Sequence, residues 1–260
     1  MNILSLTSFV LAGVVFGYAA FTSTDNPMAF IDFHGALIVF GGSIAATAIS
    51  FQLDRIFVML KVFWYRTLKG QKPNYVKIIK SLMRLADAYR KGENMDTHVT
   101  KQDDHFIKEG MQMLLDGVIE VNEIPRVLKK RVMTTHSRYQ ADAARFVSMG
   151  KYPPAMGLLG AVMGMIALLS GLGKPGAEAG VGPAMSIALV ATLYGIALAN
   201  LVVIPIGENL TETSGEIKNK NLMIVEGIKL IAAKTNPIVL AEELNSFLLP
   251  SERIDWKNLD

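Results

Sequence analysis

The feature that most constrains this chain is a set of four long stretches that carry almost no charge. A helix needs about 20 apolar residues, at 1.5 Å each, to cross roughly 30 Å of hydrocarbon. Such stretches occupy Ile3 to Phe21, about Phe33 to Leu53, Tyr152 to Gly173, and part of Ala179 to Gly207. A soluble chain of 260 residues that is 51% hydrophobic has too little polar surface to cover four such helices. The sequence therefore predicts an all-α membrane protein with four transmembrane helices.

The basic residues are distributed unevenly along the chain. Most of the 26 Lys and Arg residues lie between Asp54 and Lys151, and nearly all the others follow Gly207. Basic residues next to transmembrane helices favour the cytoplasmic side, so both termini are expected in the cytoplasm. No motif that reads RNA or DNA accompanies the net charge of +3, so we expect no nucleic-acid partner.

Composition divides the chain into four regions, and we expect the two polar ones to be helical. Apolar residues recur every three or four positions between Asn74 and Arg145, with breaks at Gly92 to Asn94 and near Pro125. A last short helix is expected from Ile238 to Leu249. The predicted regions are a transmembrane hairpin (1–53), a cytoplasmic helical domain (54–151), a second transmembrane hairpin (152–207) and a cytoplasmic helical tail (208–260).

The first span has an alternative interpretation as a cleaved signal peptide. The small residues Ala19 and Ala20 follow an apolar run, as they do at a cleavage site. Against cleavage, nothing basic precedes Ile3, whereas a signal peptide normally begins with a positive segment. The orientation of everything downstream is the same in both cases.

No pattern of catalytic or metal-binding residues is present. The chain lacks the P-loop, GxSxG, HExxH and CxxC patterns, and its four histidines are not spaced as metal ligands. We expect His98, His105 and His136 on the solvated surface. The sequence therefore predicts neither an enzyme nor a cofactor.

The third and fourth spans are rich in small residues. Gly157, Gly160 and Gly164 lie near one face of the third span, and small residues let helices approach closely in lipid. They serve either packing within one hairpin or, in addition, a second face that lines an assembly. Neither span has an ionisable residue in its middle, where an ion pathway normally has a carboxylate. If the protein conducts ions, that carboxylate must come from a partner.

Two prolines lie near the expected cytoplasmic ends of these spans, Pro154 in the third and Pro205 in the fourth. Proline removes a backbone donor and favours a kink. The prolines are either passive residues of the helix ends or hinges that transmit motion between membrane and cytoplasm.

Short motifs in a characteristic order resemble the MotA/PomA family, the A subunit of the flagellar motor stator, within the MotA/TolQ/ExbB proton-channel superfamily. The resemblance covers nearly the whole chain. It rests on Asp32, Gly41-Gly42-Ser43, Leu85 to Gly92, Pro154 to Gly160, Gly182 to Met185, Thr192 to Gly195, Pro205-Ile206, Asn236-Pro237 and Leu248 to Pro250.

This resemblance implies a bacterial inner-membrane complex in which five A subunits surround two B subunits. Each B subunit would have one transmembrane helix with an ion-accepting aspartate and a peptidoglycan-binding domain. Ion flow would move the A ring, whose cytoplasmic lobe would push on a FliG-like rotor switch protein.

The resemblance also implies roles for residues of the ion pathway. Thr192 would face the B-subunit carboxylate, Tyr194 follows it, and Asp32 would lie near the outer mouth or simply anchor at the headgroups. Ala161 stands where sodium-driven members have threonine. Since a hydroxyl can replace part of a cation's hydration shell and a methyl group cannot, we predict protons rather than sodium.

Coupling and rotor contact are assigned by the same resemblance. Pro154 and Pro205 match the family prolines tied to conformational coupling, and Arg90 and Lys91 match a basic pair that contacts the rotor. The family places a glutamate about eight residues beyond the arginine, where this chain has His98. The sequence therefore does not identify which residue supplies the negative charge of the rotor contact.

The nearest alternative is a TolQ/ExbB-type subunit that energises an envelope system. Such proteins resemble the last two spans but usually have three spans and a different order of cytoplasmic segments. Four spans, the Asn236-Pro237 tail and the Arg90-Lys91 segment favour the stator.

Overall fold

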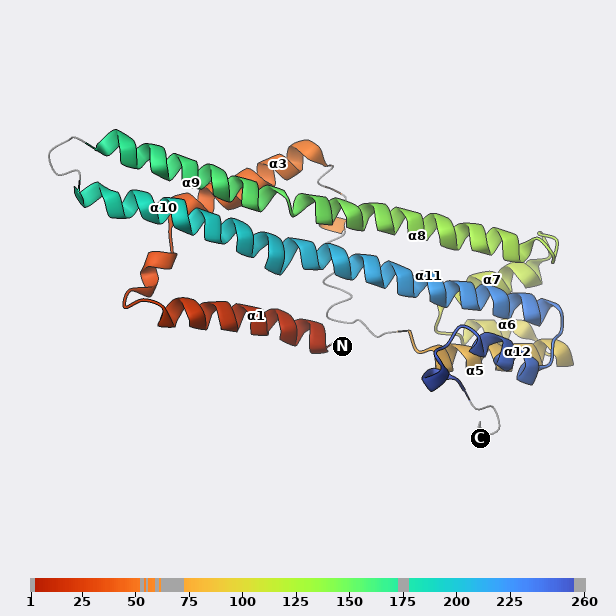
Figure 1. Cartoon of the computed structure of the whole chain (residues 1–260). Helices are drawn as coiled ribbons and strands as arrows, with labels where there is room; N and C mark the ends of the chain where they lie inside the picture. The colour runs from red at the N-terminus through yellow and green to blue at the C-terminus, as the bar shows by residue number, and fades with distance from the viewer. Residues whose placement is uncertain are drawn as a thin grey trace. The chain divides into compact units, whose positions relative to one another are not determined.

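The computed structural model describes residues 3–51, 54, 56–58, 61, 73–172 and 178–254, and every regular element among them is helical (Figure 1). The prediction of an all-α fold is thus confirmed for these residues. The chain forms two compact units, the first comprising Met1–Gln71 and Gln140–Glu212, the second Lys72–Tyr139 and Thr213–Asp260. The division falls inside α8 (Ile124–Met149) and α11 (Ile204–Ala232).

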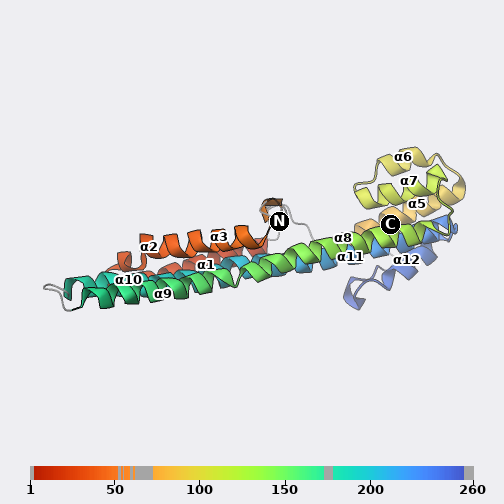
Figure 2. The same cartoon turned by 90° about the horizontal axis from the view of Figure 1, so that it is seen from above.

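The first unit contains the apolar helices. After α1 (Ile3–Thr22) and a short turn, η1 (Pro27–Phe30), one helix runs through α2 (Phe33–Ala36), η2 (Leu37–Gly41) and α3 (Gly42–Ser50). Helix α9 (Tyr152–Gly171) packs along α10 (Glu178–Ala197), which continues through η3 (Leu198–Val203) into α11. The α2–α3 helix lies against this α9/α10 pair (Figure 2).

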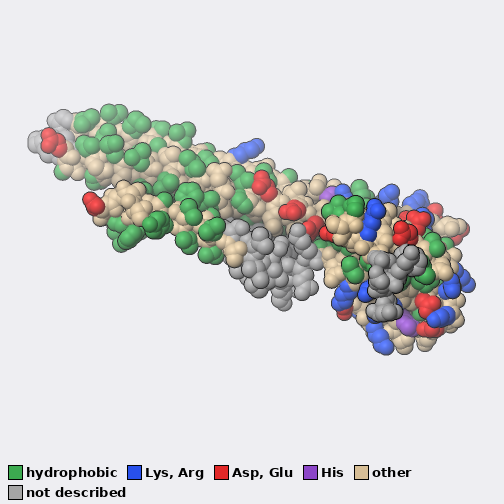
Figure 3. All heavy atoms as spheres, turned by 60° about the horizontal axis from the view of Figure 1, so that its bottom comes forward, with side chains coloured by type: hydrophobic (Ala, Val, Ile, Leu, Met, Phe, Trp, Pro, Cys, Tyr) green, Lys and Arg blue, Asp and Glu red, His purple; other side chains and the backbone are tan. Residues whose placement is uncertain are grey.

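Among the described residues, three helical segments are long and apolar enough to cross a membrane. They are Pro27–Ser50, Ile124–Gly171 and Glu178–Ala232. In α1 the apolar segment Val10–Thr22 is shorter than these three. Large hydrophobic side chains such as Leu158, Val162 and Ile166 of α9 are exposed. Figure 3 shows hydrophobic side chains over the visible face of this unit and charged ones gathered on the second unit. An apolar surface of this extent suits contact with lipid.

The helix from α2 to α3 buries every fourth residue: Gly35, Val39, Ser43 and Thr47. In a regular α-helix a step of four residues rotates about 40° beyond a full turn, so such a stripe would drift off the contact face. The wider π-helical turn Leu37–Gly41 holds more residues per turn and reduces this drift. The turn therefore keeps the stripe of small and polar residues against α9 and α10.

The second unit is a cluster of amphipathic helices. It contains α5 (Tyr75–Lys91), α6 (Met95–Thr100), α7 (His105–Asp116) and α12 (Pro237–Asn245), with parts of α8 and α11. Asn or Asp side chains cap the first turns of α5, α6, α7 and α12. Helix α5 ends where Gly92 adopts the left-handed conformation at φ 72°, which confirms the break predicted there.

One hydrophobic core holds these helices together. Its fully buried side chains include Ile79, Leu82, Leu85, Ile107, Met111, Leu128, Met223, Ile224, Ile228, Ile231 and Leu240. Gly110 lets α7 approach α11 closely, because a Cβ there would overlap the side chain of Ile228. The helical period of the sequence therefore corresponds to a packed interior.

One helix boundary agrees with the sequence prediction and one differs from it. The break predicted near Pro125 is confirmed, because α7 ends at Asp116 and α8 begins at Ile124, with Pro125 in a first turn that needs no backbone donor. Helix α12 ends at Asn245, well before Leu249. Its Asn245 side chain bonds both the N–H and the carbonyl of Ile254, at 2.9 and 3.0 Å, and so stabilises a turn after the helix.

Candidate functional site

Helices α9 and α10 meet backbone to backbone along a line of glycines. A Cβ added at Gly157 would lie 2.8 Å from the carbonyl oxygen of Ala191, and one at Gly164 would lie 2.7 Å from that of Ala184. A Cβ at Gly195 would overlap the carbonyl oxygen of Pro153. Packing within one hairpin therefore explains these glycines, the first of the two alternatives drawn from the sequence.

Thr192 lies at this contact line. Its hydroxyl donates to Ala188 O, four residues earlier, at 3.0 Å, and makes a longer contact of 3.5 Å with Gly157 O. The side chain is half-buried. Because its donor is already used within the helix, the hydroxyl is left to act as an acceptor toward an incoming group.

Ala161 lies one helical turn beyond Gly157 on the same face of α9, and it is half-buried. Its methyl group can neither donate nor accept a hydrogen bond. At this depth the described part of α9 and α10 therefore offers one hydroxyl, that of Thr192, where a threonine at 161 would offer two.

Tyr194 joins α10 to the segment before α2. Its hydroxyl donates to Phe30 O at 2.6 Å and accepts from Asp32 N at 3.3 Å. The Asp32 carboxylate in turn accepts from Gly35 N at 2.6 Å and caps α2. The structure thus brings Tyr194 and Asp32 together through the Asp32 backbone, and it gives the carboxylate a capping role.

Replacing Tyr194 with phenylalanine is expected to loosen this junction. The change deletes both bonds and leaves Phe30 O without the Tyr194 hydroxyl as its donor, which costs about 1–3 kcal/mol. The midpoint of thermal unfolding in detergent should fall. Tyr18→Phe is the matched control, because that exposed side chain has no hydrogen bond among the described residues; equal midpoints for the two variants would contradict the role given to Tyr194.

The two prolines lie at different kinds of position. Pro154 follows Pro153 in the first turn of α9, where the missing donors break no helical bond. Pro205 is the second residue of α11 and follows the π-helical turn Leu198–Val203. Proline excludes a regular helical bond to the carbonyl four residues earlier, and a widened turn relieves the clash with that carbonyl. Pro205 therefore lies at an irregularity inside a long helix, and Pro154 at a helix start.

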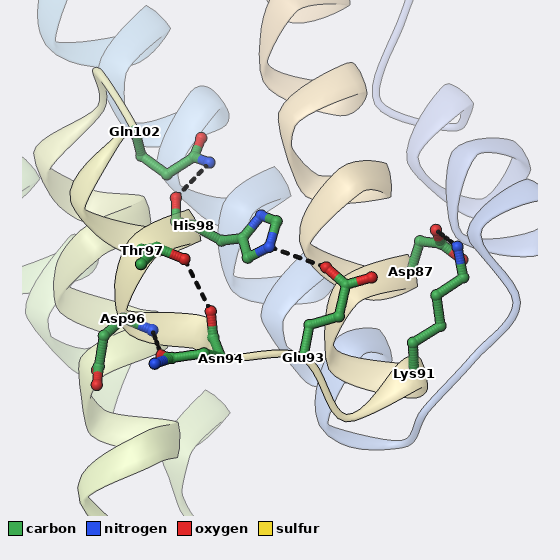
Figure 4. A network of polar contacts seen from close by, with 8 residues as sticks. All are labelled: Asp87, Lys91, Glu93, Asn94, Asp96, Thr97, His98 and Gln102. Carbon is green, nitrogen blue, oxygen red and sulfur yellow. Dashed lines mark hydrogen bonds and ion pairs between the residues drawn. The ribbon is translucent and has the colours of Figure 1, made fainter.

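Arg90 and Lys91 occupy the last turn of α5, and both are exposed. Lys91 Nζ binds Asp87 Oδ2 at 2.6 Å, and this hydrogen bond raises the pKa of the Lys91 amine (Figure 4). Arg90 makes no hydrogen bond or ion pair within the described residues. Of the predicted basic pair, Lys91 is therefore ion-paired with Asp87, and Arg90 is left to bind another molecule.

His98 stands close to an acidic side chain that the sequence did not single out. Its Nε2 lies 2.9 Å from Glu93 Oε2, across the turn between α5 and α6 (Figure 4). His136 also has a polar partner, because its Nδ1 lies 2.9 Å from the hydroxyl of the buried Ser214. Neither partner was visible in the spacing of the sequence, since both contacts depend on how helices meet.

Two further residues of the first unit were missed. Gly35 lets α2 reach α10, because a Cβ there would lie 3.3 Å from Ala191 N. Ser43 is buried, and its hydroxyl has no hydrogen-bond partner among the described residues. The described residues contain no cluster of side chains that could hold a metal.

Comparison with known proteins agrees with this geometry. The MotA/TolQ/ExbB proton channel family matches residues 98–221. The chemotaxis protein PomA of Vibrio alginolyticus is 29% identical over 245 residues, 94% of each chain. The flagellar MotAB stator complex from Bacillus subtilis contains a chain with a TM-score of 0.86 and 26% identity, covering 97% of this chain and 99% of that one. The prediction of a stator A subunit is confirmed by these similarities.

Motility protein A of Borreliella burgdorferi is 30% identical to this chain over 258 residues, which are 96% of each chain. With this agreement over nearly its whole length, the chain belongs to the motility protein A family of flagellar stator subunits, within the MotA/TolQ/ExbB proton channel family.

Proposed function

We propose that this chain, together with a second subunit, converts a proton current into torque. Its helices would line the proton pathway with hydroxyl groups, and the second subunit would supply the acid that takes up the proton. The observation that carries the proposal is the composition of α9 and α10. The middle of these helices offers the hydroxyls of Ser186, Thr192 and Tyr194 but no carboxylate, cationic side chain or histidine. Since a proton crosses hydrocarbon only on titrating groups or water, the titrating acid belongs to a partner helix.

That partner is a B subunit with one transmembrane helix that carries an aspartate, followed by a peptidoglycan-binding domain. The similarity to a chain of a MotAB complex supports this assignment. The exposed apolar faces of α9 and α10 leave room for both a partner helix and further copies of this chain. We propose a ring of A subunits, with five as the expected number, in the bacterial inner membrane. All four apolar stretches would span it, and both termini would be cytoplasmic.

The second unit is the part proposed to act on the rotor. It carries most of the charged side chains and the exposed Arg90, and it would contact a FliG-like switch protein. Pro205 and the π-helical turn before it lie inside the helix that leads from α10 toward this unit, which supports a coupling role for Pro205. Pro154 would act at the start of α9.

The coupling ion is predicted to be the proton. Ala161 leaves Thr192 as the hydroxyl near Gly157, too few ligands to replace the hydration shell of sodium. Swimming speed should stay constant when external sodium is replaced by potassium, and it should fall when a protonophore collapses the proton gradient. Speed that follows sodium at a constant proton gradient would contradict this prediction.

A flux measurement in liposomes tests the central proposal. The chain alone should pass no protons, and the chain reconstituted with its one-span partner should pass them. Replacing the partner's aspartate with asparagine should abolish the flux, while Thr192→Val in this chain should reduce it. Flux through the chain alone would overturn the proposal, as would flux that survives loss of the partner's aspartate.

A further inference from the structure

We infer that Asp96 is the acidic half of the surface that docks on the rotor, opposite in sign to Arg90. The inference rests on the proposed function, which places Arg90 at that surface. It goes further because it names the residue that takes the acidic role, and with it the charges that the docked segment must carry. The ion pairs of the second unit supply the argument.

Five acidic residues lie between the last two turns of α5 and the start of α7: Asp87, Glu93, Asp96, Asp103 and Asp104. Three of them hold cations. Asp87 binds Lys91, Asp103 binds Lys77, and Asp104 binds Lys220 at 2.6 Å while it caps α7. The Lys77 hydrogen bond also lowers the pKa of the Asp103 carboxyl. These three carboxylates therefore have their charge compensated within the chain.

Glu93 is occupied as well, by His98. The ring nitrogen Nε2 of His98 and the carboxylate of Glu93 are 2.9 Å apart, and Figure 4 shows the two side chains facing each other across the turn. A histidine in place of an acid at position 98 thus does more than remove a negative charge. It engages the nearest alternative acid, Glu93, which could otherwise have taken the role.

Asp96 is the acid that remains. It is exposed in the first turn of α6, and its carboxylate makes no hydrogen bond or ion pair among residues 73–172 and 178–254. In Figure 4 its carboxylate points away from the Glu93–His98 pair. Its backbone N–H donates to the Asn94 side chain at 3.0 Å and its backbone carbonyl accepts from the Thr100 hydroxyl at 2.6 Å, so both bonds leave the carboxylate unused. Its negative charge at a helix start is stabilised by the helix dipole without consuming its acceptor oxygens.

Arg90 is the matching cation. It is exposed in the last turn of α5, where the helix dipole favours a positive charge, and its guanidinium has no partner among the described residues. The unpaired charges Arg90 and Asp96 thus flank the turn at Gly92 with opposite signs. Paired opposite charges fix the orientation of a partner as well as attract it, since the reversed orientation places like charges together. The occupant is therefore a rotor segment with one carboxylate and one Lys or Arg, in the complementary order.

A charge swap in motile cells tests the inference. Arg90→Asp combined with Asp96→Arg keeps the net charge of the surface but inverts its polarity. We expect this double variant to lose most of its torque in a tethered-cell or bead assay, at least tenfold, and Asp96→Lys alone to lose a comparable share. The matched control is Lys77→Asp combined with Asp103→Lys, which swaps a pair that is satisfied within the chain and should retain wild-type torque.

The outcomes separate this inference from the function on which it rests. Proton flux with the one-span partner, measured in liposomes for each variant, should stay at the wild-type level. Wild-type torque in the Arg90/Asp96 swap would overturn the inference. Loss of torque in Arg90→Asp with none in Asp96→Lys would overturn the role of Asp96 while leaving the proposed function intact. Absence of proton flux in the wild-type complex would instead reject the proposed function itself.

Discussion

Replacing Gly195 with alanine is expected to disrupt the first unit more than the same change at any other glycine that the structure describes there. The new Cβ would overlap the carbonyl oxygen of Pro153 and lie 3.0 Å from its carbonyl carbon. These are backbone atoms at the start of α9, so no side chain can rotate to make room. Overpacking of this kind costs about 1–3 kcal/mol, and a rigid neighbour favours the upper end. We expect a lower unfolding midpoint in detergent and a clear loss of motility.

Gly182→Ala is the matched control for this prediction. Gly182 lies on the same helix, α10, and a Cβ there would meet no atom within 4 Å. Alanine also has the higher helix propensity, by about 1 kcal/mol, so this variant should unfold at the same or a higher temperature. The close contact of α9 and α10 would be refuted if Gly195→Ala matched Gly182→Ala in both stability and motility.

Replacing Asp104 with alanine is expected to destabilise the second unit by about 2–4 kcal/mol. The carboxylate accepts from the backbone N–H groups of Phe106 and Ile107, and it binds Lys220 Nζ at 2.6 Å. Both charged side chains are only about 20% exposed. The variant therefore loses a helix cap and leaves the Lys220 ammonium without its partner in a poorly solvated site.

The neighbouring residue provides the control, because Asp103→Ala removes an ion pair that is fully in water. The side chains of Lys77 and Asp103 are 64% and 77% exposed, and such pairs add little to stability. Denaturant unfolding should therefore separate the two variants, with a lower midpoint for Asp104→Ala and no measurable shift for Asp103→Ala. If both variants shifted the midpoint equally, burial would not be what distinguishes the two acids.

The candidate site shows where sequence reasoning stops. The apolar stretches and the glycine spacing predict the helices and their close approach, because these depend on residues near one another in the chain. Local spacing could not show that Tyr194 holds the backbone at Phe30 and Asp32, more than 160 residues away. Nor could it show that His98 engages Glu93, since that contact depends on the turn between two helices.

By itself the sequence determined that this protein is helical and apolar over long stretches, and that the middle of α9 and of α10 contains no acid, because hydrophobicity, helical period and residue identity are properties of the chain. Only the tertiary structure decided which charges are free. Of five acids within eighteen residues, three pair with lysines, Glu93 contacts His98, and the carboxylate of Asp96 has no partner among the described residues. The reason is that an ion pair requires two side chains within about 4 Å, and folding brings together residues as distant in the chain as Asp104 and Lys220.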